Sequence, residues 1–298
     1  MRGILARLRL VAEAGADSLP ELLLQAHAVA NMPIPGEHRT QRSGQGDQFW
    51  QFRPYSSQDR PQDIDWRQSG KGDQIFIRQK QKQNVQSVLF WCNPHASMDY
   101  TSSSRRPTKR EAAHILTLAL AIMMQRAGEH IGVAGQHKTG RSESMLNDLG
   151  EALISKDALS LYALPGVVAR AQSALVLCSD FIEDAALGRV TLNALAPRFS
   201  TGVVIQVLDP AEMDLPWRGR VIFEDGISSL RESIHNVSSV REAYRQKIQN
   251  HIAQYKKICD AIGWMHVVHR TDQPYAATLE KIYALNAART PDTASGSS

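Results

Sequence analysis

Cysteine is scarce in this sequence. The 298 residues contain three cysteines, Cys92, Cys178 and Cys259, which lie far apart and form no CxxC pair. An odd number of widely spaced cysteines argues against a disulfide framework. Thiols that stay unpaired are typical of a reducing compartment, so the cysteine pattern favours the cytoplasm.

Long apolar runs are also lacking. No stretch approaches the roughly 18 consecutive apolar residues that a membrane-spanning helix needs. The apolar part of HILTLALAIMMQRAG is too short for this role and predicts a buried helix instead. The opening MRGILARLRLVAEAG has basic residues but no unbroken apolar core, so we expect no signal peptide. The sequence predicts a soluble cytoplasmic protein with no membrane partner.

The charge is low for a protein dedicated to nucleic acids. The formal net charge is +4, and only 21% of the residues are charged. The basic stretches Arg78/Lys80/Lys82 and SSSRRPTKR (102–110) have no aromatic residues interleaved with them, and such runs are usually solvated faces. A basic nucleic-acid-binding module therefore stays an alternative only. Gly44-x-Gly46 lacks the Lys-Ser/Thr pair of a phosphate loop.

Composition and hydrophobic patterns divide the sequence into four parts. Residues 1–34 predict an N-terminal helical segment, with Leu5 to Val29 helical and Pro20 interrupting the helix near Ser18. Residues 35–84 are rich in Gly, Gln, Asp and Arg with isolated aromatics, which indicates a small β-rich module. Residues 85–287 alternate between strand and helix patterns. Residues 288–298 form a polar tail that we expect to be disordered.

The alternating part predicts a doubly wound α/β domain. Strand patterns occur at VQSVLFWC, HIGVAG, SALVLCSDF, GVVIQVLDP and WMHVVHR. Helix patterns separate them, including one that Thr108 opens and Gly128 ends. Strands that alternate with helices favour a mostly parallel sheet covered on both faces.

Short polar side chains follow two of these strands. Asn93-x-His95-x-Ser97 comes after the first strand, and Ser179-Asp180 ends a later one. In a doubly wound sheet the binding site forms at the carboxyl ends of the strands, near the point where the strand order reverses. The two segments are therefore the candidate site, and their arrangement resembles the metal-ion-dependent adhesion site of a von Willebrand factor A domain.

A set of motifs makes the resemblance specific. The chain resembles the bacterial family known as domain of unknown function 58, whose second part is similar to an A domain. The matching segments run from about Pro35 to Ala287 and are Gly36–His38, Gly44–Phe49, Arg53–Tyr55, Asp59–Arg60, Asp63–Arg67, Ser97–Met98, Ser179–Phe181 and Asp209–Glu212. The resemblance implies a von Willebrand factor A-like fold, no established catalysis, and a role as partner or adaptor of MoxR-type AAA+ ATPases.

The candidate site departs from the A-domain pattern. That pattern has Asp, Ser and Ser where this chain has Asn93, His95 and Ser97, so a carboxylate and a hydroxyl are missing. Mg²⁺ prefers hard oxygen ligands, whereas an imidazole suits Zn²⁺ or Ni²⁺ better. Only Asp180 keeps the anionic role, and Thr139 is a possible third-loop ligand. We interpret the site as degenerate and expect no bound metal or other cofactor.

An acidic cluster offers a second chemistry. Asp59, Asp63 and Asp65 form a possible metal site for a hydrolase, which we keep as an alternative. The simpler interpretation is a structural turn in which these carboxylates pair with arginines and Trp66 is buried. The structural motif then consists of Arg53, Tyr55, Asp59, Asp65, Trp66 and Arg67. Cys92 beside His95 lacks an orienting third group, so we predict that Cys92 is a buried structural thiol.

These observations favour a non-enzymatic adaptor that works with a MoxR-type AAA+ ATPase in protein maturation or remodelling. Other A-domain proteins are further possible partners. The expected docking surface contains the degenerate adhesion site, and a basic patch just beyond it supplies donors for acidic groups. The patch consists of Arg105, Arg106, Lys109 and Arg110. Arginine suits this role because its planar group pairs with carboxylates through two hydrogen bonds.

Overall fold

The chain has two compact units. In this computed structural model, residues 38–85 form one unit, and residues 1–37 together with 86–298 form the other. The structure describes residues 19–32, 49–55, 64, 66–70, 72, 74–80, 87–155, 159–166, 173–224 and 231–289. The N-terminal helix belongs to the larger unit, and each unit is described by itself below.

The smaller unit is built on a two-stranded antiparallel ribbon. Strand β1 (Phe49–Pro54) pairs with β2 (Phe76–Lys80), and the short helix α3 (Trp66–Ser69) lies between them in sequence. The backbone N–H of Phe76 donates to Ser69 Oγ at 2.9 Å, which ties α3 to the start of β2. The prediction of short strands in this segment is confirmed for β1 and β2.

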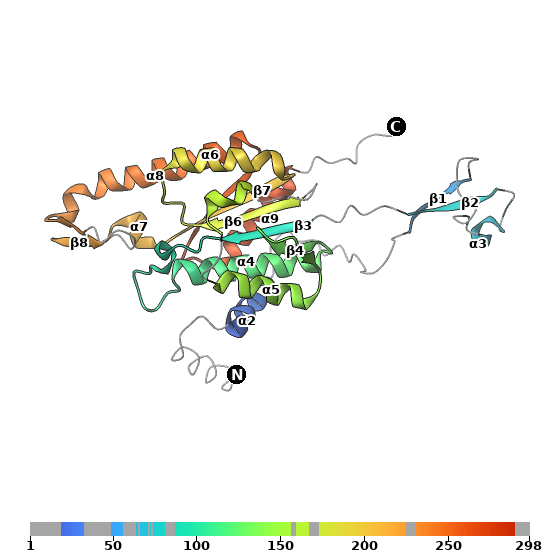
Figure 1. Ribbon diagram of the computed structural model, residues 1–298, viewed down its shortest axis with the longest axis horizontal. Coiled ribbons are helices and arrows are strands. Elements are labelled where there is room, and N and C mark those ends of the chain that lie inside the picture. The colour runs from blue at the N-terminus through green and yellow to red at the C-terminus, as the bar shows by residue number, and fades with distance from the viewer. Residues whose placement is uncertain are drawn as a thin grey trace. The chain divides into compact units, whose positions relative to one another are not determined.

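The larger unit contains a six-stranded sheet in the order β10-β7-β6-β3-β4-β5 (Figure 1). Its five parallel strands are β3 (Ser87–Cys92), β4 (His130–Val133), β6 (Ser173–Ser179), β7 (Thr201–Leu208) and β10 (Met265–Arg270). The two-residue strand β5 (Thr139–Gly140) pairs antiparallel at the edge. The chain winds outward from β3 in both directions, so the order reverses between β3 and β6. The predicted doubly wound α/β fold is confirmed.

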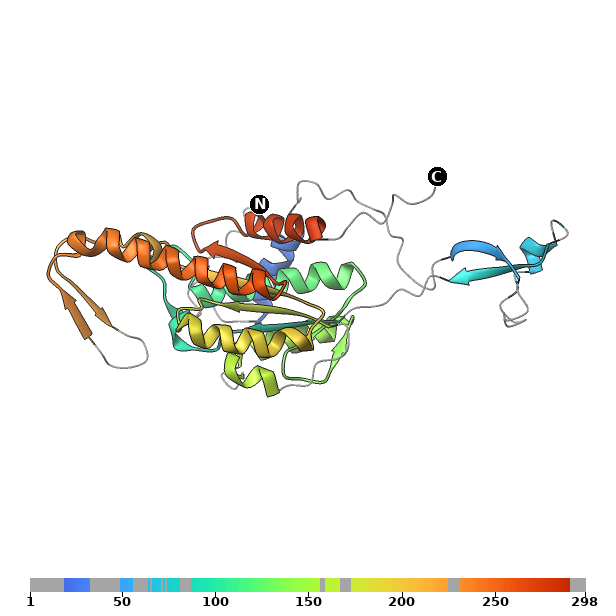
Figure 2. The same cartoon turned by 90° about the horizontal axis from the view of Figure 1, so that it is seen from above.

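Helices cover both faces of the sheet. Figure 1 shows α4 (Lys109–Arg126) and α5 (Glu143–Ile154) on one side, and α6 (Ala185–Leu195) and α8 (Val237–Ala261) on the other. The view from above shows α6 and α8 lying over the sheet and running roughly along its strands (Figure 2). Alternate residues of β3 feed the two cores: Phe90 packs on the α4 side and Trp91 on the α6 side. The strand period of two residues explains this division.

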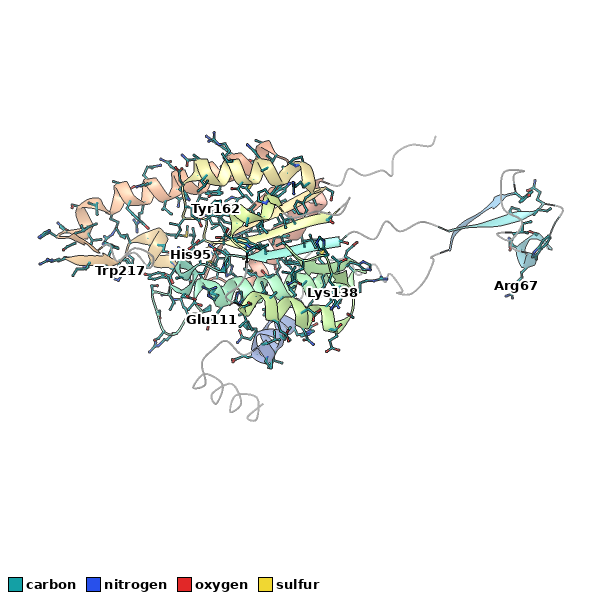
Figure 3. All side chains as sticks on the ribbon, in the orientation of Figure 1. Arg67, His95, Glu111, Lys138, Tyr162 and Trp217 are labelled. Carbon is teal, nitrogen blue, oxygen red and sulfur yellow. The ribbon has the colours of Figure 1, made fainter. Side chains whose placement is uncertain are left out.

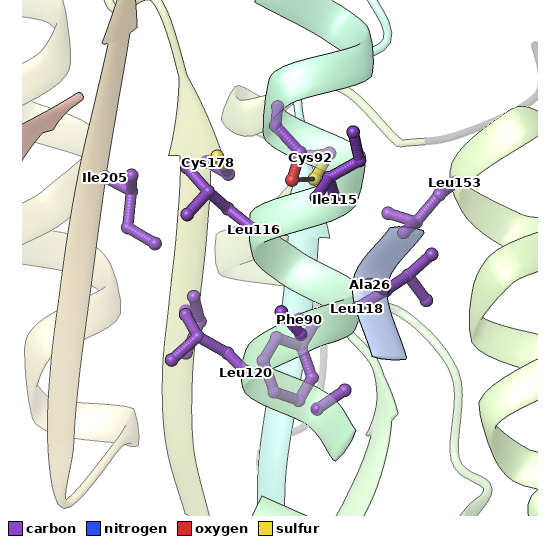
Figure 4. Close-up of a cluster of buried hydrophobic side chains, with 14 of the residues drawn as sticks. Ala26, Phe90, Cys92, Ile115, Leu116, Leu118, Leu120, Leu153, Cys178 and Ile205 are labelled. Atoms are coloured by element: carbon purple, nitrogen blue, oxygen red, sulfur yellow. Dashed lines mark hydrogen bonds between the residues drawn. The ribbon is translucent and has the colours of Figure 1, made fainter. Parts of the chain in front are cut away.

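Helix α4 is the central helix of its layer. Thr108 Oγ1 accepts from the N–H of Glu111, and the Glu111 carboxylate accepts from the N–H of Thr108, which fixes the start of the helix. Leu116 and Leu118 are both fully buried although they point to different sides (Figure 4). The helix is buried on most sides because the sheet lies on one side, and α5 and α2 (Leu19–Ala30) lie on the other.

The N-terminal helix is part of this layer. Leu22, Ala26 and Val29 are buried at helical spacing and pack against α4. Residues Leu5 to Ser18 of the predicted helix lie outside the described residues. The closing helix α9 (Tyr275–Arg289) adds Leu279 and Ile282 to the same core.

An insertion between β7 and α8 was not predicted from the sequence. It contains α7 (Pro210–Asp214) and an antiparallel hairpin of β8 (Val221–Glu224) and β9 (Arg231–Ile234). Both views show the hairpin and the start of α8 beyond the carboxyl ends of the parallel strands (Figures 1 and 2). Among the described helices, none is long and apolar enough to cross a membrane.

Candidate functional site

Asn93 joins the two strands at the reversal point. Its backbone N–H donates to Cys178 O at 2.9 Å, which extends the pairing of β3 with β6. Its side chain donates from Nδ2 to Ser179 Oγ at 2.9 Å and accepts at Oδ1 from the N–H of His95 at 3.0 Å. Asn93 is only 6% exposed, so both ends of its amide hold the loop rather than face a ligand.

His95 lies half-buried at the carboxyl end of the sheet (Figure 3). Its Nδ1 accepts from the N–H of Ser97 at 3.2 Å and caps the short 3-10 helix η2 (Ala96–Asp99). Because Nδ1 accepts, the ring proton of a neutral His95 lies on Nε2. The structure gives Ser97 a half-buried position on the same loop.

A lysine lies beside Asp180 at the carboxyl ends of the parallel strands. Lys109 Nζ lies 2.8 Å from Asp180 Oδ2 and 2.6 Å from Glu212 Oε1. Lys109 and Asp180 are each 1% exposed. The Tyr100 ring also faces the ammonium, with its centroid 5.9 Å away. Lys109 therefore acts as an internal cation that neutralises charge at the reversal point.

The two carboxylates around Lys109 have further partners. Asp180 Oδ1 accepts from Ser179 Oγ at 3.3 Å, so hydrogen bonds link Asn93 through Ser179 and Asp180 to Lys109. Glu212 Oε2 accepts from the N–H of Asp209 in a capping box at the start of α7. Burial raises the pKa of Glu212, and the Lys109 ammonium opposes this rise. The network therefore links side chains of α4 and α7 to the end of β6.

The backbone after Asp180 is strained. Phe181 has φ 47°, a left-handed conformation that is uncommon for a bulky residue. Its N–H donates to Ser179 Oγ at 3.2 Å, and its carbonyl accepts from His251 Nε2 at 2.6 Å. Its ring is fully buried, with its centroid 5.3 Å from that of Tyr255. Strain of about 1–2 kcal/mol persists only where the surroundings hold it, so these contacts fix the direction of Asp180.

The predicted basic patch divides into two pairs. Arg105 is exposed and Arg106 is half-buried. Arg110 donates to the carbonyl of His95 at 2.9 Å and forms an ion pair with Asp99, so it braces the loop. The expectation that Lys109 faces a partner is wrong, because its side chain is 1% exposed. For the half-buried Arg110, which already pairs with Asp99, a contact with a partner stays a prediction. Arg105 and Arg106 remain available.

Thr139 does not join the candidate site. It lies on β5, which β4 separates from β3, and it pairs with Gly132. Within the described ranges, no group of three or more His, Cys, Asp or Glu side chains is placed to hold a metal ion. The prediction that Cys92 is a buried thiol is confirmed: it is 6% exposed, and its sulfur lies 3.0 Å from Thr117 Oγ1 (Figure 4).

The motif of the smaller unit has one clear correction. Trp66 is 69% exposed, so the prediction that it is buried is wrong. It begins the single-turn helix α3, and Arg67 is exposed beside it (Figure 3). The backbone N–H of Tyr55 donates to the carbonyl of Ile75 at 2.7 Å, and Arg53 lies on β1. Asp59, Asp63 and Asp65 lie outside the described residues, so the acidic cluster stays a prediction.

The comparisons with known proteins give one match. The family model described as protein of unknown function DUF58 matches residues 51–254, about two thirds of the chain. The chain belongs to the DUF58 family. The matched range of this DUF58 protein includes the last four residues of β1, the candidate loop, Asp180 and Glu212. No curated protein and no solved structure matches the chain.

Sequence reasoning missed the roles of Lys109 and Glu212. A signal was present for each. The Thr108–Glu111 capping box places Lys109 at the first turn of α4, directly at the carboxyl ends of the strands. Asp209–Glu212 has the pattern of a second capping box directly after a strand. What the sequence does not give is the distance between these two helix starts.

Proposed function

We propose that this DUF58 protein is a non-enzymatic adaptor that binds a MoxR-type AAA+ ATPase during maturation or remodelling of another protein. The family resemblance suggests the partner, and a cytoplasmic location belongs to the same proposal. The observation that carries the mode of docking is the Lys109 ammonium between Asp180 and Glu212. It supplies within the chain the positive charge that an A domain takes from a metal.

The docking surface that we propose lies around this internal cation. His95 and Ser97 are half-buried on the loop after β3, and Arg105 is exposed on the following loop. Cations on such a surface attract acidic groups of a partner, and salt screens this attraction within about 10 Å at 0.1 M ionic strength. Binding of this kind is sensitive to salt and indifferent to a chelator.

The test is a binding titration against the cognate ATPase in its nucleotide-free form, so that a chelator removes no metal from a bound nucleotide. We expect the same affinity in Mg²⁺ and in EDTA, and weaker binding as salt rises. The triple variant His95→Ala, Arg105→Glu, Arg106→Glu should bind more weakly. Exposed charge pairs contribute about 0–1 kcal/mol each, so single changes are too small.

The matched control reverses charge elsewhere on the larger unit. Arg189→Glu with Lys257→Glu changes two exposed residues on α6 and α8 and should bind as the unmodified protein does. If the triple variant binds at full strength, the interface lies elsewhere. If the unmodified protein fails to bind the ATPase at every salt concentration, the adaptor proposal is wrong.

A further inference from the structure

A hollow of about 530 Å³ lies at the carboxyl edge of the larger unit. Residues 105–107 of the loop before α4 form one wall, and residues 271–275, between β10 and α9, form the other. The second wall is anchored, because the N–H of Thr271 donates to Leu208 O at 3.0 Å, at the end of β7. The Arg106 side of the hollow also has a fixed backbone, since the N–H of Arg106 donates to Ser103 O.

Arg106, which lines this hollow, has an unsatisfied donor. Its Nη1 atom is buried and has no hydrogen-bond partner among the described residues. Two neighbouring arginines differ: Arg110 binds Asp99 and two carbonyl oxygens, and Arg270 binds two aspartates. A buried donor without an acceptor is costly, so an acceptor that enters the hollow would gain more than an ordinary surface hydrogen bond gives.

The acidic residue on the opposite wall does not supply this acceptor. Asp272 receives hydrogen bonds from Arg270 at both oxygens, from Nε at 2.9 Å and from Nη2 at 2.7 Å. This pairing holds the pKa of Asp272 below its usual range. Arg270 therefore supplies the direct partner of Asp272, and the nearby Arg106 guanidinium lowers the pKa of Asp272 further. In the part of the chain that the structure describes, neither Arg105 nor Arg106 forms an ion pair of its own, and both line the hollow.

We infer that the hollow between Arg106 and Tyr275 binds a carboxylate of an acidic peptide segment of the protein partner. This deepens the docking function proposed above and rests on it. The planar guanidinium pairs with a carboxylate through two hydrogen bonds. The half-buried Tyr275 ring, which stacks on His269 at 5.3 Å, offers a surface for the adjoining part of the peptide.

The chemistry favours a carboxylate over a nucleic-acid backbone. Burial raises the pKa of the Tyr275 phenol to about 12, so the ring stays neutral beside an anion. A phosphodiester strand needs a row of cations that follows its charges, together with rings that stack its bases. The hollow presents two arginines and an aspartate, which suits a single small anion.

The test uses the full-length protein and a fluorescein-labelled peptide that ends in Glu-Glu, with anisotropy as the readout. Two further probes are the Gln-Gln peptide with an amidated end and a single-stranded oligonucleotide. Amide NMR signals of Thr271, Gln273 and Tyr275 report where the peptide binds. Arg106→Gln is the variant, and Arg189→Gln on the exposed face of α6 makes the same charge change as a control.

We expect the acidic peptide to bind and to shift the three amide signals. Arg106→Gln should weaken binding about tenfold or more, the usual effect of losing a hydrogen-bonded charge pair. Arg189→Gln should leave it unchanged. Because Arg106 Nη1 has no internal acceptor, Arg106→Gln should not lower the melting temperature, whereas loss of a purely structural arginine would.

Three outcomes overturn the inference. The first is no peptide binding at millimolar concentration, and the second is an equal loss in both variants. The third is tighter binding of the oligonucleotide than of the acidic peptide. None of these outcomes depends on the ATPase titration. If the protein binds the ATPase but not the peptide, the adaptor proposal stands and the inference that the hollow binds a carboxylate is wrong.

Discussion

At the scale of single residues, the main feature is the ion triad of Lys109, Asp180 and Glu212, in which the first two side chains are buried and Glu212 is half-buried. Removing water from charged groups is expensive, so a buried ion pair gives little net stability compared with apolar residues of the same volume. Breaking the pair by removing one partner is much more costly, because the other charge stays buried. The main effect of the triad is therefore to hold the starts of α4 and α7 against the end of β6 at the carboxyl edge of the sheet.

Lys109→Met should lower the free energy of unfolding by about 3–5 kcal/mol, since it leaves the buried Asp180 and the half-buried Glu212 without their cation. Urea unfolding at neutral pH measures the change. The control is Lys138→Met, because Lys138 pairs with Asp148 at the surface and is 67% exposed. That change should cost less than about 1 kcal/mol. Equal losses in the two variants would show that the triad is not a buried charge cluster.

Trp66→Ala should change stability by no more than about 0.5 kcal/mol, because surface substitutions usually have effects of this size. The side chain is 69% exposed on α3. Thermal unfolding followed by circular dichroism, together with the soluble yield, measures the effect. An insoluble or unfolded variant would contradict the exposed position of Trp66.

At the scale of elements, one indole ring packs unusually close to the sheet. On the α8 side, Trp264 lies over β7 at Gly202, with 2% of its surface exposed. A Cβ atom at Gly202 would overlap the indole ring, so only glycine permits this close approach. Phe199 packs its ring at 6.5 Å from the same indole, edge to face.

Gly202→Ala should therefore destabilise the larger unit by about 1–3 kcal/mol, the usual cost of overpacking a core. Gly166→Ala is the control, since nothing lies within 4 Å of a Cβ there and its φ is not positive. Denaturant midpoints of the two variants give the comparison. A midpoint for Gly202→Ala equal to that of Gly166→Ala would mean that Trp264 moves away without cost.

At the scale of the whole molecule, two buried histidines, His114 and His269, and the half-buried His266 make the fold sensitive to acid. Burial lowers the pKa of His114, His266 and His269 to about 4. In the unfolded chain these imidazoles protonate near pH 6.5, so the unfolded state binds more protons between pH 6.5 and about 4. The free energy of unfolding is therefore not reduced by these histidines above pH 6.5, and it falls as the pH drops through this window.

His114→Leu should reduce the loss of stability at acid pH. Between pH 7 and pH 5 each such histidine accounts for up to about 2 kcal/mol of lost stability. The variant should therefore lose about 1–2 kcal/mol less than the unmodified protein over the same interval. Urea unfolding at the two pH values measures the difference. The same slope in both proteins would show that His114 takes up its proton without unfolding.

The amino-acid sequence by itself determined the layered architecture. Strand and helix periods, the Thr108 cap and the breaks at Gly128 and Pro210 are local signals, so the alternation of elements and the doubly wound sheet followed from them. The meeting of the Asn93 loop with Ser179-Asp180 followed as well, because parallel strands bring their carboxyl ends to one edge, whereas the strand order itself came from the structure. The β8–β9 hairpin was not predicted, because its strands are short and carry no long periodic pattern.

Only the tertiary structure decided what the polar residues do. The sequence places Lys109 in a basic run, and its pairing with Asp180 and Glu212 joins positions 71 and 103 residues away along the chain. Such pairings depend on where two helix starts meet, which no local period encodes. Burial is likewise a collective property: Lys109 is buried and Trp66 is exposed, the reverse of their residue types, because the surrounding elements and not the side chains set the access of water.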